Sequence, residues 1–379
     1  MPRSAKRMAL AALAFLGCGG SSTQLGGATA IAAGYSHTCA IVGGGALCWG
    51  DDSEGQVGDE LTSTATTSPV QVFDLTSGVS AIAGGGQHTC AIVGGSLECW
   101  GANYYGQLGN NSTSTVANVP LPVLGLPAGG VSMVSAGYSH TCAVAGGAVY
   151  CWGSNASGQL GSGTAGGTSL LPVQVPSLTV GVTAIAAGYA HTCALQNGGV
   201  QCWGSNAKGE LGDGTDTDSD LPVPASGLSS GVLGVASGPG SQHTCALLSG
   251  GTVYCWGLND FGQIGAPSTT MSPVPVQVPS LTAGVSALAL GGTHSCAVVN
   301  GGALCWGNND FGQIGTPSTT ASPVPLPVGG LTSGVSSIAA GGTHTCAVAG
   351  GAVQCFGQDQ FGQLGNGALS DSGVPVFVQ

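Results

Sequence analysis

Residues 191–203 read HTCALQNGGVQCW, and this stretch decides the fold because it recurs seven times, with small variations, every 50 to 52 residues along the 379-residue chain. Each copy begins with His-Thr/Ser-Cys and, after eight or nine further residues, continues with Cys-Trp/Phe-Gly. The histidines of these copies are all the histidines of the protein: His37, His88, His140, His191, His243, His294 and His344. A unit of this length cannot bury its apolar side chains alone, so the sequence predicts an architecture of stacked repeats.

Each repeat contains four short segments with the character of β-strands. In the fourth copy these are residues 172–175, 182–188, 191–195 and 199–203, each bounded by Gly, Pro or Asn. Asn197-Gly198 predicts a two-residue hairpin turn, because both central residues of a type I′ turn have positive φ. Four antiparallel strands per repeat are typical of a propeller blade. The sequence therefore predicts an all-β fold, a seven-bladed β-propeller of four-stranded antiparallel blades.

The two ends of the repeat series predict how the ring closes. Copies two to seven each begin with a Pro-Val strand, whereas the first copy begins at Ala28 without one. Residues 374–378 supply a strand of this type at the other end. We therefore expect the C-terminal strand to return to the first blade and close the ring, which removes the exposed edges of an open array.

Fourteen of the fifteen cysteines lie in the repeats, two in each copy. Counting outward from the turn at Asn197-Gly198 places Cys193 opposite Cys202 at a non-hydrogen-bonded position, where the Cα atoms are about 4.5 Å apart, near the short end of the disulfide range. Zinc is the alternative, because His-x-Cys and a second cysteine offer three ligands, but no Cys-x-x-Cys accompanies them. The sequence predicts one disulfide in each blade: Cys39–Cys48, Cys90–Cys99, Cys142–Cys151, Cys193–Cys202, Cys245–Cys255, Cys296–Cys305 and Cys346–Cys355.

The histidines and the large aromatic residues recur in equivalent positions, which favours structural roles. A catalytic histidine is a single group with a tuned neighbour, whereas these seven have the same surroundings in sequence. We expect each imidazole to form a hydrogen bond within its own blade; a ring of imidazoles around the axial channel is the alternative. The aromatic residues of the Cys-Trp/Phe-Gly motif are expected to pack between blades: Trp49, Trp100, Trp152, Trp203, Trp256, Trp306 and Phe356.

Residues 137–143 read GYSHTCA and residues 152–161 read WGSNASGQLG, and this combination recurs over about residues 28–379. The pattern resembles the repeat of the regulator of chromosome condensation family. The resemblance implies a seven-bladed β-propeller. The cysteine pairs and the acidity depart from the family's pattern, so the resemblance implies no chromatin or nucleotide-exchange role.

The fifteenth cysteine follows an N-terminal segment typical of an export signal. Basic residues precede a short apolar stretch there, which is too short to span a bilayer. Residues 15–18 read FLGC and resemble the lipobox of bacterial lipoproteins, in which the cysteine is lipidated. We therefore expect a lipoprotein signal peptide over residues 1–17, lipidation of Cys18, a short tether over 18–27 and the propeller over 28–379. The alternative is a soluble secreted protein that loses Cys18 on cleavage.

The charge of the exported chain limits its partners. Lys208 is its only Lys or Arg against sixteen acidic residues, which gives a net charge near −15. Nucleic-acid binding needs cationic side chains that neutralise phosphates, so we expect no nucleic-acid partner and no membrane contact except through the lipid on Cys18. The expected location is the outer membrane or cell surface of a Gram-negative bacterium, as a lipid-anchored monomer.

The copies differ most within the Gly-x-Asn-x-x-Gly-Gln loop, just before its second glycine. A position that is acidic, basic, small or aromatic in different copies is expected to face solvent, and its aromatic members predict a binding patch. The alternative is that these rings pack on the neighbouring loop. The candidate binding residues are Tyr104, Tyr105, Phe261, Phe311 and Phe361.

The acidic stretch over residues 213–220 resembles a calcium loop that lacks the glutamate at its twelfth position. The candidate ligands are Asp213, Asp216, Asp218 and Asp220, and a solvated acidic loop is the alternative.

Two functions of different classes remain. The first is a surface scaffold that binds an envelope or extracellular protein or a glycan, with no cofactor. The alternative is a propeller enzyme, a hydrolase or lyase, for which the chain offers only clustered acids such as Asp51, Asp52 and Glu54. The absence of any unrepeated histidine and of any cysteine outside the pairs, Cys18 excepted, favours the scaffold.

Overall fold

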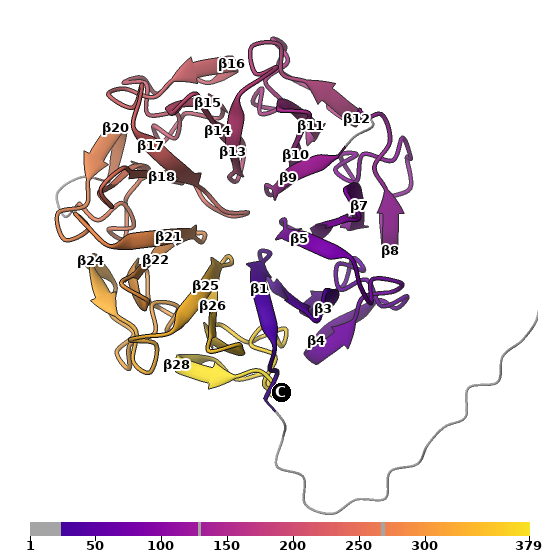
Figure 1. The fold of residues 1–379 in the computed structure, drawn as a ribbon, viewed down its shortest axis with the longest axis vertical. Coiled ribbons are helices and arrows are strands. Elements are labelled where there is room, and N and C mark those ends of the chain that lie inside the picture. Colours follow the sequence, from indigo (N-terminus) through magenta and orange to yellow (C-terminus); the bar gives the residue numbers. More distant parts are fainter. Residues whose placement is uncertain (1–23, 128–129, 267–269) are drawn as a thin grey trace, which may run out of the picture.

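The computed structural model describes residues 24–127, 130–266 and 270–379, and these residues form seven four-stranded antiparallel sheets around a central axis (Figure 1). The predicted seven-bladed β-propeller is therefore confirmed. Within the described ranges, no helix is long and apolar enough to cross a membrane.

Each blade consists of four strands that follow one another in the chain. Blades one to four comprise β1 (Ala28–Ala33), β2 (His37–Val42), β3 (Gly45–Asp52) and β4 (Ser63–Gln71); β5 (Val79–Gly84), β6 (His88–Val93), β7 (Ser96–Ala102) and β8 (Val116–Pro122); β9 (Val131–Ala136), β10 (His140–Ala145), β11 (Ala148–Ser154) and β12 (Thr168–Gln174); β13 (Val182–Ala187), β14 (His191–Gln196), β15 (Gly199–Gly204) and β16 (Ser219–Pro224). Blades five to seven comprise β17 (Val232–Ala236), β18 (His243–Leu248), β19 (Val253–Leu258) and β20 (Met271–Gln277); β21 (Val285–Leu290), β22 (His294–Val299), β23 (Gly302–Gly307) and β24 (Ser322–Pro327); β25 (Val335–Ala340), β26 (His344–Ala349), β27 (Ala352–Gly357) and β28 (Ser372–Phe377).

The first strand of each blade lies nearest the axis and the fourth lies at the rim (Figure 1). Small side chains such as Ala33, Ala136 and Ala340 line a narrow axial cavity of about 190 Å³. The rim strands contain proline, as at Pro273 and Pro275 in β20. Proline donates no ladder hydrogen bond, so these edges are protected from pairing with another chain.

The connections divide the molecule into two faces. The loops between first and second strands and those between third and fourth strands lie at one end of the blades, which we call the loop face. The hairpin turns, such as Gly43-Gly44, and the linkers between blades lie at the other end, the hairpin face. All candidate binding residues are in loops of the loop face.

The strand assignment corrects one expectation from the sequence. The Pro-Val strand is the last strand of the preceding blade, not the first strand of the next: β12 pairs with β11, and β28 pairs with β27 through partners such as Cys355 and Val376. The C-terminal strand therefore does not return to the first blade. The sequence could not decide this, because a strand that precedes one repeat also follows another.

The ring closes instead through a linker built from both ends of the described chain. In a continuous linker, Leu75 N donates a hydrogen bond to Val72 O (3.2 Å), with two residues between them. At the closure, Leu25 N donates to Val378 O (2.8 Å), and Gln379 and Gln24 occupy the two intervening places. The C-terminal segment thus ties the last blade to the first, although its strand belongs to blade seven.

All seven predicted disulfides are present. Each joins directly opposed residues of the second and third strands, such as Cys193 and Cys202. The Cα atoms of each pair lie 4.0 to 4.1 Å apart. This agrees with the predicted non-hydrogen-bonded register.

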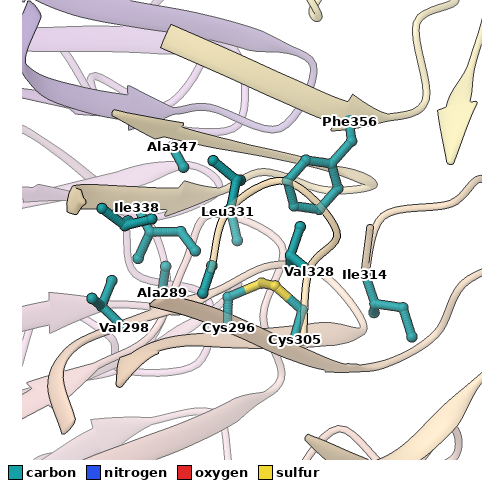
Figure 2. Close-up of a cluster of buried hydrophobic side chains, with 13 residues drawn as sticks. Ala289, Cys296, Val298, Cys305, Ile314, Val328, Leu331, Ile338, Ala347 and Phe356 are labelled. Atoms are coloured by element: carbon teal, nitrogen blue, oxygen red, sulfur yellow. A yellow bond between two sulfur atoms is a disulfide. The ribbon is translucent and has the colours of Figure 1, made fainter. Parts of the chain in front are cut away.

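Seven apolar clusters lie between neighbouring blades. In the cluster between blades six and seven, Phe356 packs with Val328 and Leu331 near the Cys296–Cys305 disulfide (Figure 2). The equivalent tryptophans of the other copies are also fully buried, as predicted. Each blade therefore buries its aromatic residue against the blade before it.

A circular permutant tests the closure. Joining Gln379 directly to Gln24, without residues 1–23, and opening the chain between Phe73 and Asp74 moves the break to the corresponding place in the next linker. Because the two linkers share the same hydrogen bonds and differ in length by one residue, we expect a folded protein whose melting temperature changes by less than about 5 °C. Thermal unfolding followed by circular dichroism measures this. An unfolded permutant would contradict the closure. The same chain opened inside β10 is the control, and it should fail to fold.

Candidate functional site

Every histidine forms a hydrogen bond to the next blade. The imidazole Nε2 lies 2.7 to 2.9 Å from a Thr or Ser hydroxyl, and the last pair closes the ring. The pairs are His37–Thr89, His88–Thr141, His140–Thr192, His191–Thr244, His243–Ser295, His294–Thr345 and His344–Thr38. The expected bond within each blade was therefore wrong as the shared contact, because the hydroxyl after each histidine faces the preceding blade. His243 also has a partner in its own blade, with Nδ1 2.8 Å from Ser241 Oγ.

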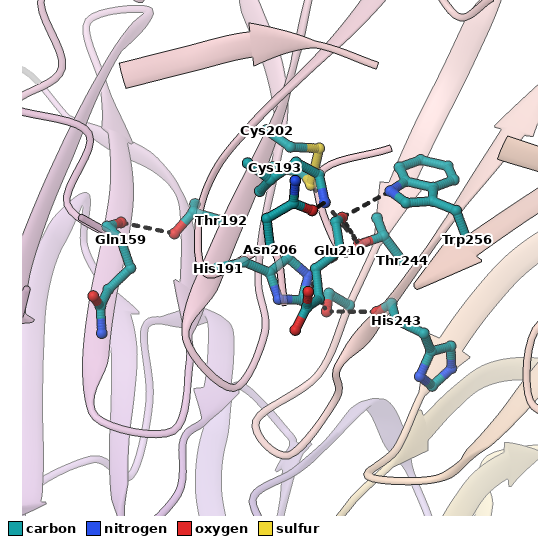
Figure 3. Close-up of a disulfide and its surroundings, with 12 residues drawn as sticks. Gln159, His191, Thr192, Cys193, Cys202, Asn206, Glu210, His243, Thr244 and Trp256 are labelled. Atoms are coloured by element: carbon teal, nitrogen blue, oxygen red, sulfur yellow. Dashed lines mark hydrogen bonds between the residues drawn. A yellow bond between two sulfur atoms is a disulfide. The ribbon is translucent and has the colours of Figure 1, made fainter. Parts of the chain in front are cut away.

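A backbone carbonyl sets the direction of these bonds. Thr192 Oγ1 donates to Gln159 O (3.0 Å), and Trp203 Nε1 donates to the same oxygen (2.9 Å). Figure 3 shows the first of these bonds and the equivalent pair from Thr244 and Trp256 to Glu210 O. A carbonyl oxygen can only accept, so the threonine hydroxyl donates its one hydrogen to that oxygen. The hydroxyl can then only accept from the imidazole, which must donate through Nε2–H.

The imidazoles are neutral and sealed from solvent. Burial lowers the pKa of His37 and His140 to about 4 and that of the other five histidines to about 3. The exposed fraction of each side chain is at most 1%. A side chain at Gly34 would clash with the His37 ring, which explains the glycine three residues before it. The seven histidines therefore hold the blades together and do not line the axial channel.

The predicted binding residues lie on the loop face. Tyr104 and Tyr105 are 53% and 46% exposed, Phe261 and Phe311 are 38% and 36% exposed, and Phe361 is half-buried. A buried glutamine holds each loop beneath the ring, as where Phe311 N donates to the Gln313 side chain (3.0 Å). The loops are thus fixed while their aromatic side chains remain available for contacts.

Three further tyrosines lie near the axis on the loop face: Tyr35, Tyr138 and Tyr189. The Tyr138 ring packs edge-on against Tyr35 (5.5 Å between centroids) and at a tilt against Tyr189 (4.8 Å). The sequence interpretation missed this group. Comparing the copies at the position two residues before each histidine would have found it. Three copies have tyrosine there, and others have Gly86, Gly292 or Gly342.

Tyr105, Tyr138 and Tyr189 line an open hollow of about 280 Å³ over blades two to four. The remaining lining residues include Ser139, Ser157 and Gln159, and none carries a charge. Among the described residues, this hollow combines exposed aromatic rings with converging hydroxyl and amide groups. It is the candidate binding site.

The acids proposed for catalysis are occupied by structural contacts. Asp52 accepts hydrogen bonds from Val57 N (3.0 Å) and Ser63 N (3.1 Å), and burial raises its pKa to about 6. In five other copies an Asn Oδ1 accepts the bond equivalent to the first of these. Asp51 accepts from Ser53 N, and Glu54 accepts from Tyr104 Oη (2.7 Å). These carboxylates shape one loop and do not converge on a common point.

The described residues contain no group of three or more His, Cys, Asp or Glu side chains that could hold a metal ion. Asp213 Oδ1 instead accepts hydrogen bonds from Thr215, and Asp218 Oδ1 accepts from Asn206 N (2.8 Å). Asp216 is exposed and Asp220 is half-buried. The first three aspartates are therefore parts of a folded acidic loop, and Asp220 lies in β16.

Acidic residues are concentrated on the loop face. Fourteen of the sixteen lie in its loops or at the adjoining strand ends, and only Asp74 and Glu98 lie elsewhere. Lys208 is on the same face. The signal peptide, Cys18 and the first part of the predicted tether lie outside the described residues.

Comparisons with known proteins agree with the fold. The RCC1-like domain pattern matches residues 77–379, and the regulator of chromosome condensation (RCC1) repeat matches residues 28–56 and 43–92. Yeast RCC1 (Prp20) superimposes with a TM-score of 0.78 at 22% identity, over 99% of this chain and 91% of the other. Human WBSCR16 has a TM-score of 0.74 at 23% identity, over 85% and 86% of the two chains.

Curated relatives are longer than this chain. The Ultraviolet-B receptor UVR8 of Arabidopsis thaliana is 30% identical over 280 residues, 72% of this chain and 63% of the receptor. The probable E3 ubiquitin-protein ligase HERC6 of Homo sapiens is 31% identical over 67% of this chain but only 25% of the ligase. The chain thus spans less than two thirds of the length of these relatives.

The buried titratable groups determine how stability depends on pH. Unfolded histidines titrate near 6.5, and their folded pKa values are about 3 to 4, so unfolding below pH 6.5 takes up protons and acid destabilises the fold. Asp52, Asp359 and Glu210 act in the opposite sense, because burial raises their pKa to about 6, 6 and 7. Because seven histidines take up protons on unfolding and only these three acids release them, lowering the pH lowers the free energy of unfolding.

We predict a net uptake of about four protons on unfolding at pH 5, since each histidine gains nearly one and the three acids together release between two and three. Denaturant unfolding with intact disulfides should therefore show stability falling by about 5 kcal/mol per pH unit near pH 5. The variant His294→Gln should take up about one proton fewer. Stability that is constant or rises from pH 6.5 to 5 would contradict neutral buried histidines.

Proposed function

The chain belongs to the RCC1-like domain family, and we propose that it is an exported scaffold that binds a protein partner on its loop face. The observation that carries this proposal is the gathering of exposed aromatic side chains on that face, over loops that are fixed from below. Tyrosine and phenylalanine on a rigid support provide contact area at little cost in conformational entropy.

The charge of the loop face favours one kind of protein partner. Asp260 and Asp310 precede Phe261 and Phe311 in two neighbouring loops, and both aspartates are exposed. Carboxylates beside aromatic rings suit Lys and Arg side chains, which form ion pairs and stack on the rings. A basic protein surface therefore fits this face best.

Binding is favoured over catalysis. The clustered acids of blade one are hydrogen-bonded within their own loop or to Tyr104, so they support no acid–base pair. HERC6 is named as a ligase, but this chain covers a quarter of it, so that activity is not carried over.

The proposed location is outside the cytoplasm. Seven disulfides are consistent with an oxidising extracellular compartment. We include in the proposal a lipid anchor on Cys18, an outer-membrane or cell-surface position in a Gram-negative bacterium, and a monomer. The variant Cys18→Ser should then leave the membrane fraction, because the lipid is its only anchor; unchanged membrane association would contradict the anchor.

Capture from envelope extract tests the binding face. The triple variant Phe261→Ser, Phe311→Ser, Phe361→Ser should lose a protein that the native chain retains, and this protein should elute with rising salt. Val180→Ser is the control, because Val180 is a 66% exposed side chain on the hairpin face. Mass spectrometry compares the retained proteins. Identical capture by the native chain and the triple variant would contradict the proposal.

A further inference from the structure

The hollow between blades two and four has a chemistry different from the acidic, phenylalanine-bearing loops. We propose that it is a binding site for one ring of a neutral saccharide. This inference goes beyond the protein scaffold proposed above and does not depend on it, because the hollow is formed by tyrosines whereas the protein contacts tested above are those of three phenylalanines.

The hollow is built from loops that hold one another in place. Tyr138 N donates to Gly188 O (3.2 Å) in the next blade, and Tyr189 N donates to Ser241 O (2.8 Å) in the blade after that. A side chain at Gly86 would collide with the Tyr138 carbonyl, so the neighbouring copy keeps glycine. The backbone of these loops is therefore fixed before any ligand arrives, and the Tyr138 ring packs against Tyr189 (4.8 Å between centroids), which lowers the cost of binding.

The polar groups of the hollow are available to a ligand. The hydroxyls of Tyr105, Tyr138, Tyr189, Ser139 and Ser157 form no hydrogen bond with any described residue. Gln159 is 3% exposed; its Oε1 accepts from Ser157 N, while Nε2 makes only a long contact of 3.4 Å to Ser154 Oγ. Donors and acceptors thus converge beside exposed aromatic surface.

This combination selects a neutral ring with hydroxyl groups. No charged side chain lines the hollow, so a charged group would lose hydration without gaining a partner. An anionic ligand would also face the net charge near −15 of the exported chain. A sugar ring presents an apolar face that stacks on a phenol and hydroxyls that bond to the rim.

The backbone argues against an extended peptide in the hollow. The N–H groups of Tyr138 and Tyr189 already donate to neighbouring loops, so they offer no ladder for a peptide main chain. The polar groups that remain for a ligand are side-chain hydroxyls and one side-chain amide, and these can form hydrogen bonds with the hydroxyl groups at the edge of a sugar ring. The volume of about 280 Å³ admits a single ring, so we expect a dissociation constant on the order of 1 mM.

Saturation-transfer NMR with the native protein tests the inference, using chitotriose, cellotriose and maltotriose as separate probes. At least one should bind, and Tyr189→Ala and Tyr105→Ala should each weaken it by about tenfold or more. Phe73→Ala, at a 45% exposed aromatic residue on the hairpin face, is the matched control and should change affinity by less than about twofold.

Three outcomes would contradict the proposed saccharide site. These outcomes are no binding of any of the three sugars, equal binding by Tyr189→Ala and the native chain, or preference for the peptide Ala-Tyr-Ala with acetylated and amidated ends. The melting temperature and partner capture of Tyr189→Ala report separately on folding and on the protein-binding face. Loss of sugar binding with unchanged partner capture would show that the two sites are independent.

Discussion

The backbone carbonyl of the buried Gln or Glu within each loop between third and fourth strands is the acceptor on which the ring depends. Gln159 O receives the hydroxyl hydrogen of Thr192 and the indole hydrogen of Trp203, both from the next blade. The first of these bonds obliges the histidine to donate through Nε2, so one oxygen fixes a loop, a buried aromatic residue and an imidazole tautomer. Gln363 O does the same for blade one, where it meets Thr38 and Trp49.

Local sequence patterns predicted the parts of the fold that depend on local geometry. The turn at Asn197-Gly198 sets the strand register, and the register places Cys193 opposite Cys202, so the disulfides could be predicted from counting alone. The histidine partner could not be predicted this way. Every copy contains both a histidine and a hydroxyl, and a periodic sequence does not show whether they meet within one blade or across two. The same ambiguity misplaced the Pro-Val strand by one blade.

The candidate site was predicted only in part, for a related reason. Comparing copies at one loop position found Tyr105 and Phe261, whose rings are exposed. It missed Tyr138 and Tyr189, which come from a different loop and meet Tyr105 only when three blades assemble. The buried contacts constrain His, Thr, Cys and Trp in nearly every copy, so the exposed loop residues remain free to differ and can carry binding.

The protonation of the histidines tests the interblade network most directly. Long-range proton–nitrogen NMR of the folded protein at pH 5.5 distinguishes neutral Nε2–H imidazole from the Nδ1–H form and from imidazolium. The network predicts that all seven histidines are neutral and carry their proton on Nε2. Imidazolium signals, or neutral rings protonated on Nδ1, would contradict it.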